Sequence, residues 1–306
     1  MDDPMADLAL CVVVFRRTGK LATLLESVGE DGPISSVYVA DNGELTDDRR
    51  ALYDRSFPFD LEVLDVAYDA GLARSRRAAV EAAEEPYLLV VDSDVEVPDN
   101  VGALHDVLRE RPGLGGVGGV LVEGDRIRSD CYDLFDRGPL LCKDIRGGKR
   151  VESVGGHPFV PFDQIQNVAL YRRACLDDYC WDPAYRIGWE HTDFFLGHRD
   201  RTEWQFGVCP TVMFRHHPGG DEAYVASRRS HERVRASKRY FLDKWGYEQV
   251  LYGQTNWLET HDGLVDPSVL VAELAKHALL RLPPRVQVPL MDLRDGIRKL
   301  RGDPPF

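Results

Sequence analysis

The strongest constraint on the fold is an alternation of short apolar runs with helical segments in the first hundred residues. Residues 8–15 (LALCVVVF) are a continuous apolar run rich in β-branched side chains, typical of a strand buried on both faces. A helical spacing of leucines follows it over residues 16–28. Further strands are predicted at 37–43, 61–66 and 87–94, and a further helix at 71–85. Strands that alternate with helices predict a parallel sheet with helices on its faces.

The later half of the chain is less regular. Residues 157–173 join a loop to a strand or a short helix, and an aromatic-rich loop enters a helix at about Glu190. Residues 204–220 are strand-like and end in paired histidines, and residues 230–246 have helical spacing. We find no internal repeat and no low-complexity linker.

Composition and charge exclude several classes of protein. A net charge of −13 argues against nucleic acid as a partner, because such binding depends on Lys and Arg that neutralise phosphates. No run approaches the roughly 20 apolar residues of a membrane span, and the acidic N-terminus lacks the basic start of a signal peptide. The six cysteines form no CxxC pair. We therefore expect a reduced, cytoplasmic compartment.

The tail from Lys276 to Arg301 differs from the rest of this acidic chain. It is Leu-rich and carries seven Lys and Arg residues against two Asp residues. Such a segment suggests peripheral contact with an anionic membrane surface, at the inner face of the cell membrane. A helix docked on its own domain is the alternative, which the sequence slightly favours.

Residues 113–118 (GLGGVG) match the GxGxxG pattern of dinucleotide-binding proteins. That motif needs a strand before it and a helix after it, because the helix N-terminus holds the pyrophosphate. Here the apolar VLVEG follows, so the glycines open a strand instead. We reject the motif, and a dehydrogenase is the least favoured class of enzyme.

Polar residues follow three of the four predicted strands, namely Asp41-Asn42, Asp69 and Asp92-Ser93-Asp94. Ligands of open α/β sheets bind outside the carboxyl ends of the strands. Asp92 and Asp94 come directly after a buried strand, and their charges repel each other unless a cation lies between them. Mg²⁺ and Mn²⁺ take carboxylates together with substrate phosphates. The pattern predicts a nucleotide site with a divalent cation, and a solvated strand end is the alternative.

Two groups of basic side chains could join this site. His216 and His217 follow an apolar stretch, and one of them could complete the shell of a cation, since imidazole is a common metal ligand. Arg74, Arg76 and Arg77 follow a predicted helix start, where they could face a diphosphate. A surface histidine pair and a solvated helix face remain the alternatives.

Three ionisable residues, Glu190, His191 and Asp193, stand at another predicted helix start. Any of them could serve as a general base, and the imidazole has an ordinary pKa suited to that work near neutral pH. The alternative is a capped helix in which the acids complement the helix dipole.

Together these residues resemble the family 2 glycosyltransferases, which are inverting enzymes of the GT-A fold. The resemblance covers about residues 8–250 and lies in the order of the motifs. These are ADNG at 40–43, DxGLxxxRR at 69–77, DSD at 92–94 and GWEHTDFF at 188–195. Pro210, ahead of His216, matches the late strand that ends in a metal-binding histidine of the family.

The resemblance implies an α/β fold with a mostly parallel central sheet flanked by helices. It implies a GT-A domain over residues 1–250, with a nucleotide-sugar-binding half at about 1–110 and an acceptor-side half at about 111–220. Residues 251–306 would form a helical C-terminal extension.

The resemblance also implies roles for single residues. Asp41 would recognise the nucleotide base, Asp92 would contact the ribose or the metal, and Asp94 would bind Mn²⁺ or Mg²⁺. His216 is a better match than His217 for the histidine ligand. The residues expected at the donor and its cation are Asp41, Asp69, Gly71, Arg76, Arg77, Asp92, Ser93 and Asp94.

Two departures from the family affect these expectations. The family usually has Glu-Asp where this chain has Glu190-His191, and that Asp is the usual base, so the base here is His191, Asp193 or Glu190. Arg77 stands where the family often has Asn, a change that would affect the choice of donor.

We therefore expect an inverting transferase that moves a sugar from a UDP-, GDP- or dTDP-sugar to an acceptor hydroxyl. The acceptor would be a glycan, soluble or lipid-phosphate-linked, in glycan or glycoprotein biosynthesis. An inactive homologue that binds the donor without turnover is one alternative. A sugar-nucleotide pyrophosphorylase is another, although FRRTGK (residues 15–20) matches its Gly-rich phosphate loop poorly.

Overall fold

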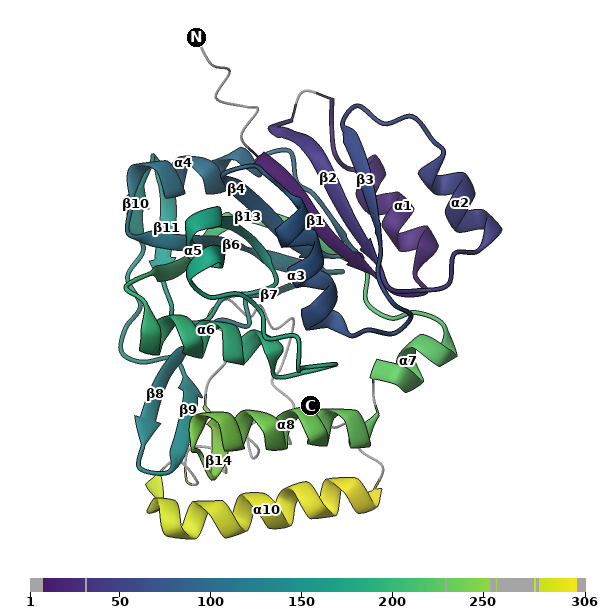
Figure 1. Cartoon of the computed structure of the whole chain (residues 1–306). Helices are drawn as coiled ribbons and strands as arrows, with labels where there is room; N and C mark the ends of the chain where they lie inside the picture. Colours follow the sequence, from purple (N-terminus) through teal and green to yellow (C-terminus); the bar gives the residue numbers. More distant parts are fainter. Residues whose placement is uncertain are drawn as a thin grey trace.

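The first predicted strand lies in the middle of a large sheet. The computed structural model describes residues 8–30, 32–228, 230–253, 257, 278 and 281–301. All seven residues of β1 (Leu8–Val14) are buried. β1 is parallel to β2 (Ile34–Asp41) on one side and to β4 (Tyr87–Asp92) on the other, and β3 (Asp60–Asp65) extends the sheet beyond β2. The predicted parallel half-sheet is confirmed (Figure 1).

Beyond β4 the sheet continues with mixed strand directions. The order is β10-β11-β13-β6-β12-β4-β1-β2-β3, with β12 antiparallel to both neighbours and β13 parallel to β6. The bounds are β5 (Val95–Glu96), β6 (Leu114–Glu123), β7 (Arg126–Arg128), β10 (Glu152–Val154), β11 (His157–Pro161), β12 (Val168–Arg172) and β13 (Gln205–His216). Short β5 pairs with the end of β13, and β7 pairs with β6. The expected fold class, an α/β sheet flanked by helices, is confirmed.

Helices cover both faces of this sheet, and a small second sheet lies below it (Figure 1). The helices are α1 (Thr18–Glu26), α2 (Asp47–Tyr53), α3 (Leu72–Ala82), α4 (Gly102–Glu110), α5 (Arg173–Asp178), α6 (Glu190–Arg201), α7 (Glu222–Arg228), α8 (His231–Trp245) and α10 (Pro284–Arg301). The second sheet has the order β14-β9-β8, from β8 (Asp133–Arg137), β9 (Leu140–Asp144) and β14 (Gln249–Tyr252). None of the described helices is long and apolar enough to cross a bilayer.

The C-terminal extension differs in part from the expectation. Residues 251–252 complete β14, so the segment after residue 250 begins in a strand instead of a helix. A helical segment is present as α10, whose Met291 is buried and whose Asp295 accepts from Lys238 of α8 at 2.7 Å. Of the predicted basic tail, residues 276–301, only residues 276, 277, 279 and 280 lie outside the described residues. The domain boundaries remain a prediction.

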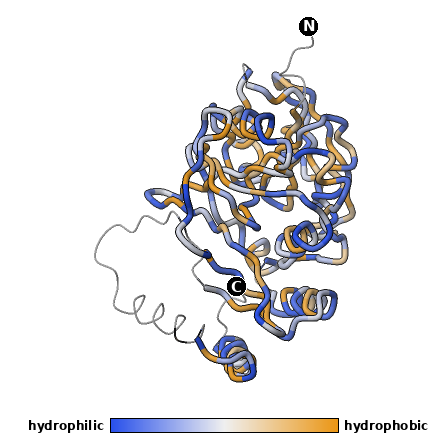
Figure 2. The backbone as a smooth tube through the Cα atoms, turned by 90° about the vertical axis from the view of Figure 1, so that its left-hand side faces the viewer, coloured by the Kyte–Doolittle hydropathy of each residue, from blue (hydrophilic) through white to orange (hydrophobic). Residues whose placement is uncertain are grey.

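The side chains of β1 alternate between two apolar cores, one on each face of the sheet. Leu10 and Val12 belong to the core that α1 and α4 cover, whereas Cys11 and Val13 belong to the core that α3 and α6 cover. This two-sided burial explains why the strand is apolar at every position. Figure 2 shows the backbone coloured by hydropathy, with apolar segments running through the body of the fold.

The GLGGVG segment opens β6, as expected from the apolar residues that follow it. Packing requires glycine at Gly116 in this segment and at Gly119 directly after it. A Cβ at Gly116 would lie 2.6 Å from the ring of Tyr171, and a Cβ at Gly119 would lie 2.5 Å from the carbonyl oxygen of Val212. β6 therefore approaches β12 and β13 more closely than any side chain allows.

Replacing Gly119 by alanine tests this account of how β6 packs. Because the added Cβ meets a backbone oxygen that cannot swing aside, we expect Gly119→Ala to lower the free energy of unfolding by about 1–3 kcal/mol. Urea denaturation measures the change. Gly113→Ala is the matched control, since a Cβ there meets nothing within 4 Å, and equal stability of the two variants would contradict the packing explanation.

Candidate functional site

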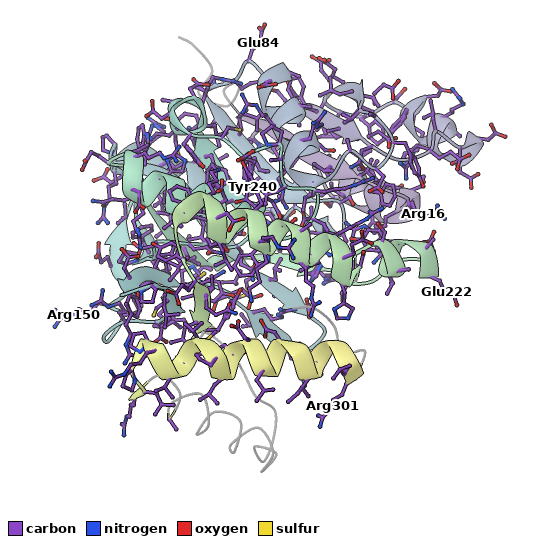
Figure 3. All side chains as sticks on the ribbon, turned by 60° about the horizontal axis from the view of Figure 1, so that its bottom comes forward. Arg16, Glu84, Arg150, Glu222, Tyr240 and Arg301 are labelled. Carbon is purple, nitrogen blue, oxygen red and sulfur yellow. The ribbon has the colours of Figure 1, made fainter. Side chains whose placement is uncertain are left out.

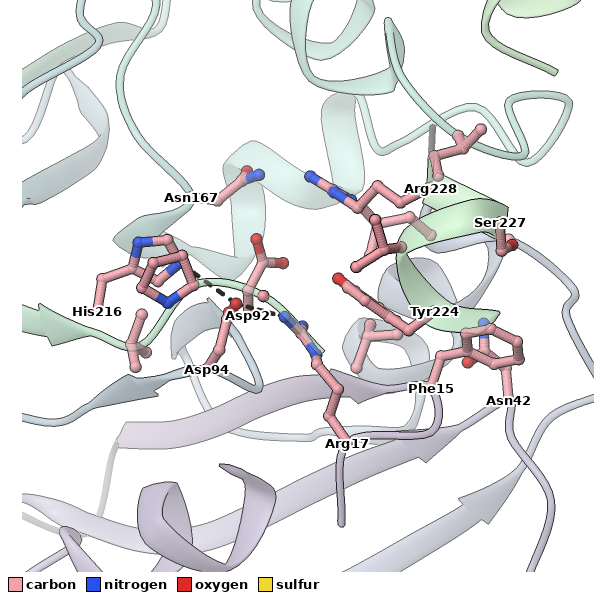
Figure 4. Close-up of a pocket in the computed structure, with 18 of the residues that line it drawn as sticks. Phe15, Arg17, Asn42, Asp92, Asp94, Asn167, His216, Tyr224, Ser227 and Arg228 are labelled. Carbon is pink, nitrogen blue, oxygen red and sulfur yellow. Dashed lines mark hydrogen bonds and ion pairs between the residues drawn. The ribbon is translucent and has the colours of Figure 1, made fainter. Parts of the chain in front are cut away.

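A cavity of about 540 Å³ opens at the carboxyl ends of β1 and β4. Parallel strands end at one edge of a sheet, so polar residues that follow different strands face a common space. Helix α7 lies across this space from the strand ends (Figure 4). The lining includes Arg17, Asp92, Asp94, His216, Tyr224 and Arg228.

Asp92 is neutralised by a buried arginine. Arg76 on α3 donates from Nη2 to Oδ1 of Asp92 at 2.8 Å, and its own side chain is only 1% exposed. Burial alone would raise the pKa of Asp92, but the charges of Arg76, Arg228 and Arg17 outweigh it and lower this pKa to about 2. Asp92 is therefore ionised at neutral pH.

Asp94 receives two basic side chains on the same carboxylate oxygen. Nη1 of Arg17 contacts Oδ2 of Asp94, and Nη2 of Arg17 donates to Oγ of Ser93 at 3.0 Å. Nε2 of His216 lies 3.2 Å from the same Oδ2 (Figure 4). Two nearby carboxylates are tolerated here because each has its own arginine.

β13 carries His216 to Asp94 because the end of β13 pairs with β5. Nδ1 of His216 lies 2.5 Å from Oε1 of Glu123, which leaves Nε2 to face Asp94. Burial would lower the pKa of His216, but its contacts with Asp94 and Glu123 raise it overall. His217 points to the other side, with Nε2 2.5 Å from Oε1 of Glu96.

The donor atoms at Asp94 and His216 fit a divalent cation that a substrate completes. Within the described part of the chain, no group of three or more His, Cys, Asp and Glu side chains forms a metal site by itself. Mg²⁺ and Mn²⁺ commonly take only one or two carboxylates from the protein, and substrate phosphates supply the rest. A carboxylate oxygen and an imidazole nitrogen 3.2 Å apart suit adjacent positions around one ion. The contact of Nδ1 with Glu123 resembles the partner that usually orients a metal-binding histidine.

Asp69 and Gly71 lie at the rim of the cavity, where the chain enters α3. Asp69 pairs with Arg186 at 2.8 Å and with Arg233 at 2.8 Å. Gly71 has a φ of 97°, and a Cβ there would lie 2.7 Å from the backbone of Arg186. Only glycine fits this close approach, which draws the loop before α6 against the strand ends.

Glu190 and His191 begin α6 outside the cavity lining, and Arg76 links Glu190 to Asp92. Glu190 is buried, with Oε1 3.3 Å from Nη1 of Arg76 and Oε2 without a hydrogen-bond partner. Nε2 of His191 lies 2.6 Å from the carbonyl oxygen of Ile165, which accepts its hydrogen. Burial, reinforced by the charge of Arg76, lowers the pKa of His191 to about 3. The imidazole is therefore neutral at physiological pH.

Asp193 lies deep between α6 and α8, away from the cavity lining. It is 0% exposed, and its carboxylate accepts from Tyr179, Tyr185 and Trp245 at 2.8–2.9 Å. Lys244 forms an ion pair with it at 2.8 Å. Both oxygens are thus occupied by groups that hold the two helices together.

Asp41 and Arg77, which were also predicted to contact the donor, are held by other groups away from the cavity lining. Asp41 accepts from Arg49 and Tyr53, each at 2.7 Å, while the next residue, Asn42, lines the cavity. Arg77 is exposed on the outer side of α3, paired with Glu81 at 2.7 Å. The roles expected for Asp41 and Arg77 therefore receive no support from where the structure places them.

Residues 9–116 match the family model described as glycosyl transferase family 2. The predicted resemblance to the family 2 glycosyltransferases is confirmed. The match covers the strands and helices from β1 to the start of β6, which include Asp92 and Asp94. It supports a role in glycosyl transfer. No curated protein sequence matches the chain.

The fold is similar to that of the S. aureus protein TarS. The crystal structure of TarS 1–349 in complex with UDP-GlcNAc matches with a TM-score of 0.57 and 14% identity, over 92% of this chain and 77% of that one. TarS 1–349 alone and TarS 1–349 with UDP match at TM-scores of 0.48 and 0.47, with 14% and 13% identity. These two alignments cover 77% of this chain and 65% and 70% of the others. At such identity the likeness is one of fold, the GT-A fold.

Sequence reasoning missed the cavity residues that come from outside the family 2 motifs. Arg17 follows β1, and the guanidinium of Arg228 on α7 points into the cavity (Figure 4). Tyr224, also on α7, lies with its ring 4.5 Å from the guanidinium carbon of Arg17. The two consecutive arginines after an apolar strand were the available signal for Arg17. No local sequence pattern marks Tyr224 or Arg228, because they lie far along the chain from the other site residues and reach the site only through the fold.

Removing the Arg76 side-chain charge tests how far this site depends on it. Arg76→Met leaves Asp92 and Glu190 without their shared cation, and we expect it to lower the free energy of unfolding by about 3–5 kcal/mol. Arg77→Met, one residue along the same helix, removes an exposed pair with Glu81 and should cost at most about 1 kcal/mol. Chemical denaturation compares the two, and equal costs would contradict the role given to Arg76.

Proposed function

We propose that the chain is an inverting, metal-dependent glycosyltransferase that moves a sugar from a nucleotide-diphosphate sugar to an acceptor hydroxyl. The observation that carries the proposal is the juxtaposition of Asp94 Oδ2 and His216 Nε2 at the mouth of a cavity, within a chain that matches family 2. An incomplete protein ligand set beside a large cavity suits an ion that arrives with its substrate.

Residues at the strand ends would hold the donor. Asp94 and His216 would bind Mn²⁺ or Mg²⁺, with Asp92 beside them, and there the cation would neutralise charge on the leaving diphosphate. Arg228 points into the same space from α7 and would pair with a phosphate. Asn42 has a buried Oδ1 without a partner in the cavity wall, suited to accept from a donor group such as a nucleobase.

The acceptor proton would pass to the cluster at the start of α6, and the geometry favours Glu190 among its three candidates. Glu190 keeps Oε2 free of hydrogen bonds, whereas both oxygens of Asp193 are occupied. A pKa of about 3 makes the His191 imidazole a weak base. Attack by the deprotonated hydroxyl on the anomeric carbon, opposite the leaving diphosphate, would invert the configuration.

Metal-dependent donor binding is the first test of this function. Calorimetry with UDP-, GDP- and dTDP-sugars, with Mn²⁺ and then with EDTA, should find one nucleotide that binds only with the ion. UDP-GlcNAc is the first choice, because TarS has been crystallised with it. We expect Asp94→Ala to weaken donor binding at least tenfold, about 1.4 kcal/mol. Asp99→Ala, at an exposed position five residues along, is the matched control.

The outcomes also separate the rival functions. Binding without sugar transfer to any glycan acceptor would favour an inactive homologue. Formation of a nucleotide sugar from nucleoside triphosphate and sugar phosphate would favour a pyrophosphorylase. Unchanged donor affinity in Asp94→Ala would overturn the proposed metal site.

We also propose that α10 places the enzyme on an anionic membrane surface, at the cytoplasmic face, where a lipid-phosphate-linked acceptor would lie. Five apolar side chains recur every three or four residues along this helix and are 41–88% exposed. They are Val286, Leu290, Leu293, Ile297 and Leu300. The opposite side packs on the protein through the buried Met291. The exposed face is thus apolar without being part of the core.

Charge supports a lipid surface as the partner of this face. Arg285, Arg294 and Arg301 are exposed on the same helix, and Arg301 projects away from the body of the protein (Figure 3). The chain as a whole carries −13, so a basic helix is the part that an anionic bilayer would attract. An apolar row flanked by arginines is typical of helices that lie in the membrane interface.

Vesicle sedimentation with the full chain tests this surface. We expect binding to vesicles that contain phosphatidylglycerol, and none to pure phosphatidylcholine, because both charge and apolar contact are needed. Leu293→Glu should abolish binding, whereas Leu45→Glu, 43% exposed on the loop before α2, should not. A chain that stays in the supernatant contradicts the proposal. A dimer that Leu293→Glu dissociates would instead assign the face to a second copy.

A further inference from the structure

The two arginines after β1 point in different directions. Arg16 has a φ of 61°, a left-handed conformation that is uncommon outside glycine. Its side chain pairs with Asp221, just before α7, at 3.1 Å, while Arg17 turns inward to Ser93 and Asp94. The turn thus directs one of two neighbouring charges to the proposed metal ligand and the other to the segment that leads into α7.

Arg17 occupies the oxygen that a cation would need. It contacts Oδ2 of Asp94, the same oxygen that lies 3.2 Å from Nε2 of His216. Its side chain is 9% exposed, and that of Asp94 is 6% exposed, so water screens the contact little. A divalent ion between Asp94 and His216 would lie against the guanidinium, and the two positive charges would repel each other.

Arg17 also retains a free donor. Its Nε is buried without a hydrogen-bond partner, although the residue lines the cavity. A guanidinium in such a position is suited to a phosphate oxygen, which accepts charge-assisted hydrogen bonds from more than one of its nitrogens. The ring of Tyr224, 4.5 Å from the guanidinium carbon, provides a surface on which the group could shift without leaving the cavity.

We propose that Arg17 is an exchangeable counter-ion, which neutralises Asp94 in the empty site and moves to the donor diphosphate when the cation binds Asp94. This inference rests on the proposed function, because it takes Asp94 as the metal ligand. Arg17 then opposes binding of the metal alone and favours binding of the metal together with the diphosphate, to which its guanidinium donates. The cation and the nucleotide then bind cooperatively. The cation displaces Arg17 from Asp94 and so releases it to the diphosphate, and the diphosphate draws Arg17 away and so releases Asp94 to the cation.

Opposite effects on two affinities test the inference. Mn²⁺ binding to the full chain is measured by electron paramagnetic resonance, first alone and then with UDP or the nucleotide identified above. We expect Arg17→Gln to bind Mn²⁺ alone at least tenfold more tightly than the wild type, because Asp94 is released. With Mn²⁺ saturating, the same variant should bind the nucleoside diphosphate at least tenfold more weakly.

Two further variants complete the design. Arg16→Gln loses its pair with Asp221 but makes no contact with Asp94, so its affinity for Mn²⁺ alone should equal that of the wild type. Arg17→Lys keeps the positive charge but lacks the guanidinium whose two terminal nitrogens contact Asp94 and Ser93 at the same time. It should bind Mn²⁺ with intermediate affinity, and it replaces Arg17→Gln if that variant fails to fold.

The result that overturns the inference differs from the one that overturns the function. If Asp94→Ala abolishes Mn²⁺ binding but the Arg17 variants bind it no more tightly than the wild type, the metal site stands and the counter-ion role fails. If Asp94→Ala leaves Mn²⁺ binding intact, the proposed metal site fails and the inference falls with it.

Discussion

The buried guanidinium of Arg76 is the contact on which the rest of the site depends. It donates to Asp92 at the end of β4 and to Glu190 at the start of α6. A planar guanidinium offers its donors at fixed angles, so it sets the distance between these two carboxylates as well as neutralising them. The strands proposed to bind the nucleotide and the helix proposed to supply the base are thereby held as one unit.

The site resolves a conflict between function and stability by local charge balance. A pair of aspartates suits a cation, yet it would repel an anionic diphosphate and destabilise the fold if left alone. Arginines from three separate parts of the chain surround this pair, namely Arg17 after β1, Arg76 on α3 and Arg228 on α7. The protein is strongly acidic overall, but the cavity is not.

Local pattern predicted the fold well where burial dictates it. The apolar spacing correctly predicted the strands β1, β2 and β4 and the helices α3, α6 and α8. Each of these elements buries apolar side chains that recur with the period of a strand or a helix. The GLGGVG segment was correctly assigned to a strand, although the reason for Gly116, its contact with Tyr171, lies in another strand. Strand β14 was not predicted, because a strand this short carries too few residues to show a period.

The sequence by itself determined the parallel strand ends and the acidic pair, because strand, turn and carboxylates are neighbours in the chain. Only the tertiary structure decided which partners those carboxylates have. Asp41 is engaged by Arg49 and Tyr53, Asp193 by residues of α8, and Asp94 by Arg17 and His216. These pairs join residues up to 122 positions apart. Such contacts arise from how sheet and helices pack, a long-range property that no short motif records.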